Sequence, residues 1–308
     1  MDYFHLYFSF LKKFYSPNPD KKLKVVFDCS NGTAGLILEK FTTNHSKLKI
    51  YFINDKPDGY FPAHGPNPLK PGAVKQLQAA VEKNKADLGI IFDADADRVF
   101  FVDDKSRFID PDAVARLLIW HLKPKKVIID VSAGWLVKKL KIIESKVGHY
   151  FIKQKMRKEN ADFGAEHSGH YYFKEFFGLD SGILAAIEVI NAVSRLPYKL
   201  SDFVELLPKY YRQEINIRRQ TSNFKCQELL KKIEDYYKLK ALPGRQAGER
   251  YKLLRISRLD GLTMEFSDWW LNLRFSNTEP LLRLNVEAQS QFKLQEQIFK
   301  LKKLLRVD

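Results

Sequence analysis

Short apolar segments alternate with segments of helical periodicity along the first 195 residues of the chain. The run at 23–28 favours a buried strand, those at 48–53, 88–92 and 99–103 favour further strands, and 73–84 between them favours a helix. Strands that alternate with helices form βαβ units, in which most neighbouring strands are parallel. The alternation therefore predicts an α/β fold.

The pattern changes near residue 205. Before it, we expect further helices over 3–15, 33–42, 112–121, 135–141, 154–160 and 182–195, and a strand over 126–131. After it, strands are expected at 214–218, 264–266, 269–275 and 281–287, with helices at 224–236 and 293–305. These elements predict two α/β domains with mixed, mainly parallel sheets, at 18–107 and 108–205, followed by a C-terminal α+β domain at 206–308.

The chain is basic, with 52 Lys and Arg residues against 37 Asp and Glu residues, a formal charge of +15. Such a balance favours anionic partners: nucleic acid, anionic lipid or phosphorylated metabolites. The sequence holds no stacking platform or recognition-helix motif, so we expect no nucleic-acid partner. No stretch approaches about 18 uninterrupted apolar residues, so we expect no transmembrane helix and no membrane partner.

The two cysteines, Cys29 and Cys226, lie in unrelated contexts. Their number and spacing argue against a disulfide framework or a zinc site and fit a reducing cytoplasm. The aromatic N-terminal segment lacks a basic start, which makes it a poor signal peptide. We therefore expect a cytoplasmic protein.

Three aspartates alternate with alanines directly after the apolar run at 88–92, in a segment that we call the acidic loop (residues 93–98). In extended backbone, Asp93, Asp95 and Asp97 share one face, where they would repel one another unless a hard cation such as Mg²⁺ neutralised them. Arg98 follows at the edge, where it could bind a phosphate or orient a base. An EF-hand is disfavoured because strands flank the loop, whereas a solvated acidic turn is the plainer alternative.

Two later segments carry polar groups suited to a sugar and a phosphate. The histidine loop (residues 166–170), expected between helices, contains Glu166, Ser168 and His170, whose oxygens and imidazole suit a vicinal pair of sugar hydroxyls. The arginine segment (residues 274–280) offers phosphate donors: Arg274, Ser276, Asn277 and Thr278. Alone, each is also consistent with an ordinary loop or strand end. His149, a lone histidine beside aromatic residues, would usually be structural.

Taken in order, these segments resemble the α-D-phosphohexomutase family, in particular its bacterial phosphomannomutase/phosphoglucomutase branch. The resemblance runs from about Leu23 to the C-terminus. It includes 27–32, 58–68, 93–98, 148–153, 166–170 and 274–280, together with Arg283 and Glu287. Each motif is short, but the ordered set is specific.

The resemblance implies a fold of four domains around a cleft and a mutase that interconverts hexose 1- and 6-phosphates through an active-site phosphoserine and a bisphosphorylated sugar. The implied metal is Mg²⁺, held by Asp93, Asp95 and Asp97. Arg98 would sit by the transferring phosphoryl group, with His149 and His170 near the substrate. Glu166 and Ser168 would bind sugar hydroxyls. The phosphate that is not being transferred would be bound by Arg274, Ser276, Asn277 and Thr278. Hexose 1,6-bisphosphate would activate the complete enzyme.

The sequence departs from the family at the nucleophile. The family carries its phosphoserine in a Thr-x-Ser-His-Asn-Pro loop of the first domain, and Ser-His-Asn-Pro occurs nowhere in these 308 residues. Residues 1–17 look like the last helix of that first domain. We expect a truncated gene model, a phosphoserine domain encoded separately, or a non-catalytic descendant.

Two functions therefore follow from the sequence. The first is a phosphohexose mutase that acts on a phosphorylated hexose and is inactive, or nearly so, as this chain alone, because it lacks a covalent phosphoryl carrier. The second is a phosphosugar-binding module without catalysis. The motifs do not choose between mannose, glucose and other hexoses, and a monomer is the default expectation.

Overall fold

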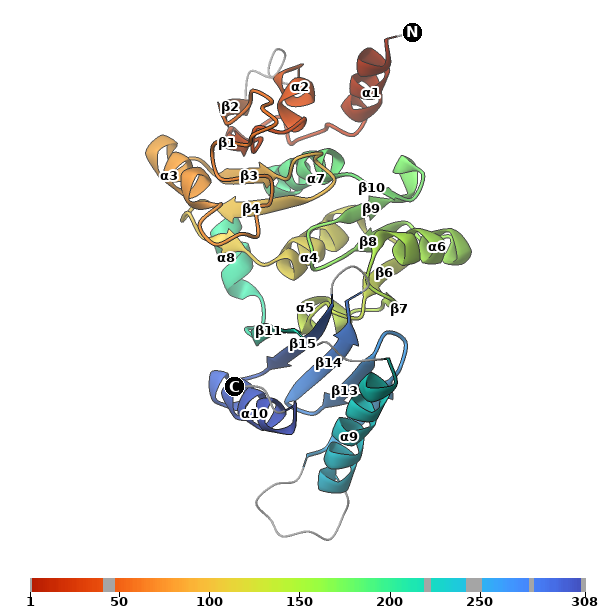
Figure 1. The fold of residues 1–308 in the computed structure, drawn as a ribbon. Coiled ribbons are helices and arrows are strands. Elements are labelled where there is room, and N and C mark those ends of the chain that lie inside the picture. Colours follow the sequence, from red (N-terminus) through yellow and green to blue (C-terminus); the bar gives the residue numbers. More distant parts are fainter. Residues whose placement is uncertain (1, 41–47, 219–222, 242–250, 277–279, 306–308) are drawn as a thin grey trace. The chain divides into compact units, whose positions relative to one another are not determined.

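A computed structural model describes residues 2–40, 48–218, 223–241, 251–276 and 280–305 (Figure 1). Internal packing divides the chain into two compact units. The first unit contains Met1–Ile129, Leu136–Ile143 and His149–Pro208, and the second contains Asp130–Trp135, Glu144–Gly148 and Lys209–Asp308. Within the described residues, no helix has the length and apolar character needed to cross a membrane.

The first sheet has the strand order β2-β1-β3-β4-β5. Its strands are β1 (Leu23–Asp28), β2 (Leu48–Ile53), β3 (Leu88–Phe92), β4 (Val99–Asp103) and β5 (Phe108–Ile109). β1 pairs in parallel with β2 and β3, whereas β4 pairs antiparallel with β3 and β5. All residues of β3 and β4 are buried, as expected for apolar strands that are covered on both faces.

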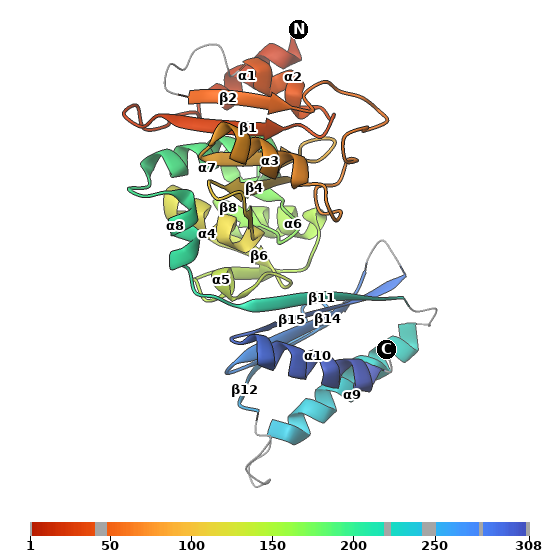
Figure 2. The same ribbon diagram turned by 90° about the vertical axis from the view of Figure 1, so that its left-hand side faces the viewer.

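Helices α2 (Ala34–Leu38) and α3 (Lys75–Asn84) accompany this sheet (Figure 2). Leu77 and Val81, about one turn apart on α3, pack into one buried cluster with residues of β1, β3 and β4. A Cβ atom on Gly89 would lie 2.6 Å from Cγ2 of Val81, so the glycine allows α3 to approach β3 closely. This packing fixes the end of β3, where the acidic loop begins.

The second sheet has the order β10-β9-β8-β6-β7. Its strands are β6 (Val127–Asp130), β7 (Ile143–Ser145), β8 (Phe163–Ala165), β9 (Tyr171–Phe173) and β10 (Leu179–Asp180). β6 and β8 are parallel, whereas β8, β9 and β10 are successively antiparallel. The helices of this region are α4 (Pro111–Leu122), α5 (Trp135–Lys138), α6 (His149–Glu159), α7 (Gly182–Arg195) and α8 (Leu200–Leu206), with a 3₁₀ turn η2 (Lys174–Phe176).

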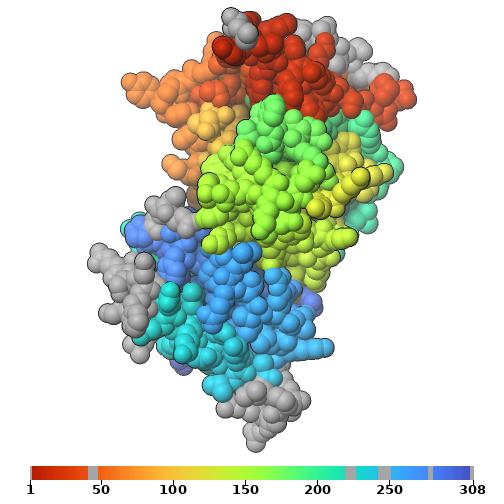
Figure 3. Space-filling model, turned by 90° about the vertical axis from the view of Figure 1, so that its right-hand side faces the viewer, coloured from red at the N-terminus to blue at the C-terminus, as the bar shows by residue number. Residues whose placement is uncertain are grey.

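The N-terminal helix α1 (Tyr3–Lys12) and the segment after it lie against α7 and η2. The ring of Phe10 lies 5.8 Å from that of Phe176, and the amide of Asn191 on α7 donates to the carbonyl of Phe14 over 2.7 Å. The backbone N–H of Ser16 donates to the other side of the same amide over 3.0 Å. Figure 3 shows this red segment beside the green part of the first unit.

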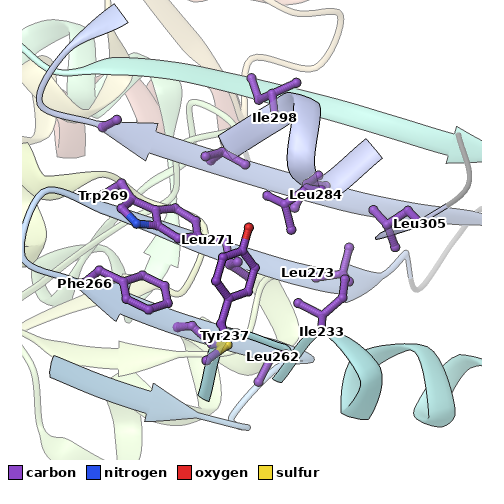
Figure 4. Close-up of a cluster of buried hydrophobic side chains, with 14 of the residues drawn as sticks. Ile233, Tyr237, Leu262, Phe266, Trp269, Leu271, Leu273, Leu284, Ile298 and Leu305 are labelled. Atoms are coloured by element: carbon purple, nitrogen blue, oxygen red, sulfur yellow. The ribbon is translucent and has the colours of Figure 1, made fainter. Parts of the chain in front are cut away.

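The second unit contains an antiparallel sheet of order β11-β15-β14-β13-β12. Its strands are β11 (Tyr211–Arg218), β12 (Leu253–Ser257), β13 (Leu262–Phe266), β14 (Trp269–Phe275) and β15 (Leu281–Ala288), and its helices are α9 (Asn223–Ala241) and α10 (Gln291–Leu305). Trp269 stacks on Phe266 with ring centroids 4.3 Å apart, and Tyr237 of α9 lies 5.1 Å from Trp269 (Figure 4). This aromatic cluster joins α9 to the sheet.

The expected α/β architecture with a C-terminal α+β part is confirmed, and both sheets of the α/β part are mixed. The first sheet is not mainly parallel, because the two parallel pairings of β1 are equalled by two antiparallel pairings of β4. The strands expected at 23–28, 48–53, 88–92, 99–103 and 269–275 and the helix at 182–195 have these bounds. The helix expected at 154–160 begins earlier, at His149, and that expected at 33–42 is described only as the shorter α2.

A buried histidine–aspartate pair fastens the loop that follows β2 to the end of β1. The Nε2 atom of His64 lies 3.0 Å from Oδ2 of Asp28, and the two side chains are 6% and 0% exposed. The other oxygen of Asp28 accepts from the backbone N–H of Ser30 and from the amide of Asn54, both over 3.0 Å. The hydrogen bond to Asp28 raises the pKa of His64 above its usual value, although burial acts to lower it.

We expect His64→Gln to lower the free energy of unfolding by about 1.5–3 kcal/mol at acidic pH, because it removes a charge-assisted hydrogen bond. Since the folded-state pKa is raised, this stabilisation is complete below the pKa of unfolded histidine, about 6.5, and is lost as the pH rises through the folded-state pKa. Urea unfolding at about pH 5.5 and about pH 9 measures the difference. The exposed His5 on α1 provides the control His5→Gln, and a His64→Gln deficit that is equal at both pH values contradicts the expectation.

Candidate active site

The acidic loop joins β3 to β4, and its backbone is held from two sides. The carbonyl of Ala94 accepts from the backbone N–H of Thr33 over 2.9 Å, and the carbonyl of Ala96 accepts from that of Gly182, the first residue of α7, over 3.0 Å. A Cβ atom on Gly32 would lie 2.4 Å from the oxygen of Ala94, so this approach requires glycine. Ala96 adopts a left-handed conformation, with φ of 62°. The loop is therefore fixed by its neighbours.

The three aspartates of this loop converge. Asp93, Asp95 and Asp97 each offer a carboxylate oxygen, and these oxygens lie within 4.8 Å of one another. Burial raises the pKa of Asp93 to about 6, even though Nε of Arg98 donates to its Oδ2 over 2.6 Å and acts to lower it. A cluster of oxygen donors in which one carboxylate is hard to ionise fits a hard divalent cation such as Mg²⁺, which would relieve the repulsion.

The histidine loop joins β8 to β9, so it lies between strands and not, as the sequence analysis expects, between helices. Its turn is closed by the backbone N–H of Glu166, which donates to the carbonyl of His170 over 3.0 Å. Gly169 has a φ of 91°, which favours glycine. The hydroxyl of Tyr172 donates to Oε2 of Glu166 over 2.6 Å, and Oγ of Ser168 lies 2.9 Å from Nδ1 of His170. These contacts hold the carboxylate and the imidazole in fixed orientations.

The two loops meet along a short stretch of backbone. Arg98 and His170 form an isolated antiparallel bridge, and the N–H of Val99 donates to the carbonyl of Gly169 over 3.1 Å. A Cβ atom on Gly169 would lie 2.6 Å from the ring of Phe100, so the close contact depends on this glycine. The metal-ligating and sugar-binding candidates of the first unit therefore form one cluster.

An ion pair also crosses this junction. The Nε2 atom of His170 lies 3.6 Å from Oδ1 of Asp97. The nearby His170 imidazole lowers the pKa of Asp97 to about 2. Burial acts to lower the pKa of His170, but Asp97 and the charges of Glu166 and Asp180 raise it above its usual value. His170 is therefore held toward its protonated form by carboxylates from three segments.

His149, the first residue of α6, lies beside this junction. Its ring centroid is 5.0 Å from that of His170, and its Nδ1 lies 2.8 Å from Oδ2 of Asp180. Lys153, one turn further along α6, places its Nζ 3.4 Å from the other oxygen of Asp180. Neither Asp180 nor Tyr172 stands out as a functional residue in the sequence. The i, i+4 spacing of His149 and Lys153 was a signal for a shared acidic partner, but it did not identify that partner.

The arginine segment belongs to the second unit. Arg274 lies near the end of β14 and is 6% exposed, and its Nε has no hydrogen-bond partner among the described residues. It stands directly opposite Arg283 of β15 in the antiparallel register. Like charges opposite each other on neighbouring strands are unfavourable, and Glu214 offsets part of this charge because its Oε1 lies 3.7 Å from Nη1 of Arg283. The N–H of Ser276 donates to the carbonyl of Leu281 over 2.9 Å, whereas Asn277 and Thr278 lie outside the described residues.

The candidate residues are thus distributed over both units. The first unit brings together, in one cluster, Asp93, Asp95, Asp97, Arg98, His149, Glu166, Ser168 and His170. The second unit carries Arg274 and Ser276. The geometry of the first cluster suits a divalent cation next to a polyhydroxylated ligand, and that of the second suits an anion.

Family models match most of the chain. They are described as phosphoglucomutase/phosphomannomutase alpha/beta/alpha domain II, which matches residues 5–106, alpha/beta/alpha domain III, residues 110–210, and the C-terminal domain, residues 214–300. A phosphomannomutase of Methanocaldococcus jannaschii is 35% identical over 297 residues, which cover 93% of this chain and 62% of the relative. A phosphomannomutase of Escherichia coli strain K12 is 33% identical, over 89% of this chain and 60% of the relative.

Solved structures have the same fold. A phosphoglucomutase/phosphomannomutase family protein from Burkholderia thailandensis superposes with a TM-score of 0.80 at 24% identity, over 98% of this chain and 64% of the other. The chain thus spans somewhat over half the length of the relatives it matches. With family models matching all three of its sheet regions, the chain belongs to the phosphoglucomutase/phosphomannomutase family.

Proposed function

We propose that this chain supplies the metal, sugar and phosphate sites of a phosphohexose mutase. The reaction would interconvert hexose 1-phosphate and hexose 6-phosphate through a phosphoserine and a hexose 1,6-bisphosphate, which would also activate the complete enzyme. The junction of the acidic and histidine loops, made by the bridge between Arg98 and His170, is the observation that carries the proposal. It supports the proposal because the three aspartates that could hold a cation lie beside groups that suit sugar hydroxyls, in a family whose relatives are named phosphomannomutases.

In this proposal, Asp93, Asp95 and Asp97 would hold Mg²⁺, which when bound neutralises charge on a phosphoryl group. Arg98 would bind the same phosphoryl group. Its guanidinium is oriented by Asp93 at Nε and lies 3.5 Å from Oδ1 of Asn67 at Nη1, so its direction is set before any ligand arrives. Phosphoryl transfer depends mainly on such positioning and charge neutralisation.

The histidine loop would recognise the sugar. Glu166 would accept hydrogen bonds from ring hydroxyls, and the Tyr172 hydroxyl keeps its carboxylate in place. Ser168 would donate to or accept from a neighbouring hydroxyl. His170 would hold a proton at Nε2 next to Asp97, and His149 would lie at the substrate's edge. Proximity of fixed donors and acceptors of this kind lowers the entropic cost of reaching the transition state.

The arginine segment would bind the phosphate that is not transferred, through Arg274, Ser276, Asn277 and Thr278. The opposed guanidinium groups of Arg274 and Arg283 support this role, because a phosphate would neutralise both. Hexose phosphates are the proposed substrates, and a cytoplasmic location is proposed with them.

The phosphoryl carrier would come from outside these 308 residues, which hold no Ser-His-Asn-Pro sequence. A serine-bearing domain could be joined to this chain in a longer protein or be a separate polypeptide. A second candidate function is phosphosugar binding without catalysis, which the proposed sugar and phosphate sites of this chain would support by themselves.

We expect the 308-residue chain alone to show no steady mutase turnover with glucose 1-phosphate or mannose 1-phosphate, because it lacks a covalent carrier. Fusion of the unmatched N-terminal part of the Methanocaldococcus jannaschii phosphomannomutase to Met1 is expected to produce turnover in the presence of Mg²⁺. A coupled assay for hexose 6-phosphate measures both. Steady turnover by the unfused chain would contradict the expectation that the chain needs a phosphoryl carrier from elsewhere. A folded fusion that binds hexose phosphate without converting it would favour the binding module.

Asp95→Asn tests the metal site with little structural disturbance, because Asp95 is exposed and Arg98 pairs with Asp93 instead. We expect Mg²⁺ affinity, measured by isothermal titration calorimetry on the chain alone, to fall by about tenfold or more. The matched control Asp235→Asn changes an exposed carboxylate on α9 and is expected to leave affinity unchanged. If Asp95→Asn and the unaltered chain bind Mg²⁺ equally tightly, Asp95 is not a metal ligand.

Glu166→Gln is expected to weaken glucose 6-phosphate binding by about 1–3 kcal/mol, because it removes a charged acceptor of sugar hydroxyls. Tyr172→Phe keeps the carboxylate but removes its hydrogen bond, so we expect a smaller loss. Calorimetric titration of the Mg²⁺-loaded chain measures both. If both variants bind as tightly as the unaltered chain, the histidine loop does not recognise the sugar.

A further inference from the structure

Four side chains at the edge of the acidic loop form a cluster whose ligand atoms are two imidazole nitrogens and two carboxylate oxygens. We call it the histidine quartet: Asp97, His149, His170 and Asp180. Their ligand atoms all lie within 4.8 Å of one another. The quartet differs from the aspartate triad, Asp93, Asp95 and Asp97, in its donors, and it shares only Asp97 with it.

The quartet's ligand atoms are spaced closely enough to compare with those of a tetrahedral site. In a tetrahedron with metal–ligand bonds of about 2.0–2.1 Å, neighbouring ligand atoms lie about 3.3 Å apart. Here Nδ1 of His149 is 2.8 Å from Oδ2 of Asp180, and Nε2 of His170 is 3.6 Å from Oδ1 of Asp97. The widest pair, at most 4.8 Å, would have to close by only about 1.5 Å to reach that spacing.

The surroundings of His170 match those of a metal-ligating histidine. Its Nδ1 faces Oγ of Ser168 at 2.9 Å and Oε2 of Glu166 at 3.4 Å, on the side of the ring away from the quartet. A carboxylate or hydroxyl partner of this kind orients an imidazole and directs its other nitrogen toward a metal. That other nitrogen, Nε2, is the atom that faces Asp97.

Access and charge also suit a cation. The side chain of His149 is 50% exposed, whereas that of Asp180 is 8% exposed, so the quartet has an open side and a buried side. A metal ion would replace the proton on Nε2 of His170, and with both imidazoles neutral the two carboxylates carry a charge of −2. Lys153 approaches Oδ1 of Asp180 and offsets part of that charge, but Oδ2 of Asp180 is the oxygen directed at His149.

We propose that the histidine quartet binds one transition-metal ion of the Zn²⁺ or Co²⁺ type in tetrahedral coordination. Two imidazoles with two carboxylates favour such an ion, whereas the all-oxygen triad favours Mg²⁺. This site does not depend on the proposed mutase function. It is measured on the chain itself, without substrate and without a phosphoserine.

The test is a Co²⁺ titration of the metal-free 308-residue chain, followed by visible absorption, with Zn²⁺ displacement followed by calorimetry. We expect one ion per chain and the intense visible bands of tetrahedral cobalt, which Zn²⁺ abolishes. His149→Gln alters a half-exposed side chain and is expected to weaken binding by about tenfold or more, as is Asp180→Asn. Thermal unfolding of each metal-free variant checks that the variant folds. If Asp180→Asn does not fold, the affinity of His149→Gln still tests the proposal.

Two control variants distinguish the quartet from its neighbours. Asp95→Asn removes a ligand of the triad only and is expected to leave the cobalt spectrum and affinity unchanged. His167→Gln removes the imidazole of a separate cluster with Asp110 and Asp112 and is expected to do the same. The proposal is overturned if the unaltered chain gives no tetrahedral spectrum, if His149→Gln binds as tightly as the unaltered chain, or if either control variant loses binding.

Discussion

The backbone bridge between Arg98 and His170 is the contact on which the candidate site of the first unit depends. It joins the end of one β-hairpin, β3–β4, to the turn of another, β8–β9, across 72 residues of sequence. Two glycines make the approach possible, because Gly169 faces the ring of Phe100 and Gly182 faces the carbonyl of Ala96. Without that approach, the candidate cation ligands and the sugar-binding candidates would not form one cluster.

Charge is distributed around this bridge so that each ionised group faces an opposite one. Arg98 lies against Asp93, His170 lies between Asp97 and Glu166, and His149 and Lys153 both face Asp180. Burial is the main reason that the pKa of Asp93 is raised, because it removes water from the charged carboxylate while Arg98 acts in the opposite direction. A divalent cation beside this carboxylate would offset the cost of that desolvation.

The sequence was sufficient to predict the elements that have a long and mainly apolar pattern. β1 to β4 have the expected bounds because each is a run of mainly apolar residues, although only β3 and β4 are buried throughout. The three aspartates of the acidic loop followed directly from their spacing. β8 and β9 were missed because three-residue strands are too short for a period, and Gly164 inside β8 usually marks a break. In the fold that glycine leaves room for the side chains of α6, since a Cβ atom there would lie 3.0 Å from Sδ of Met156 and would push it away.

Partners that come together only in the tertiary structure also could not be predicted from the sequence. Asp180 and Tyr172 are ordinary strand residues by position, and their roles arise because β9 and β10 place them beside His149 and Glu166. The motif residues themselves could be singled out, but the contacts between them could not. The ion pair of Asp97 and His170 is such a contact, formed across 73 residues of sequence.

The most direct test of this account is a double-mutant cycle of Asp97→Asn and His170→Gln, with the free energy of unfolding measured at about pH 6, where His170 is protonated. If the junction couples the two hairpins, the double variant loses less free energy of unfolding than the sum of the two single losses. The expected coupling energy is about 0.5–3 kcal/mol. Strictly additive effects would mean that the acidic and histidine loops are neighbours without being coupled, which contradicts the account.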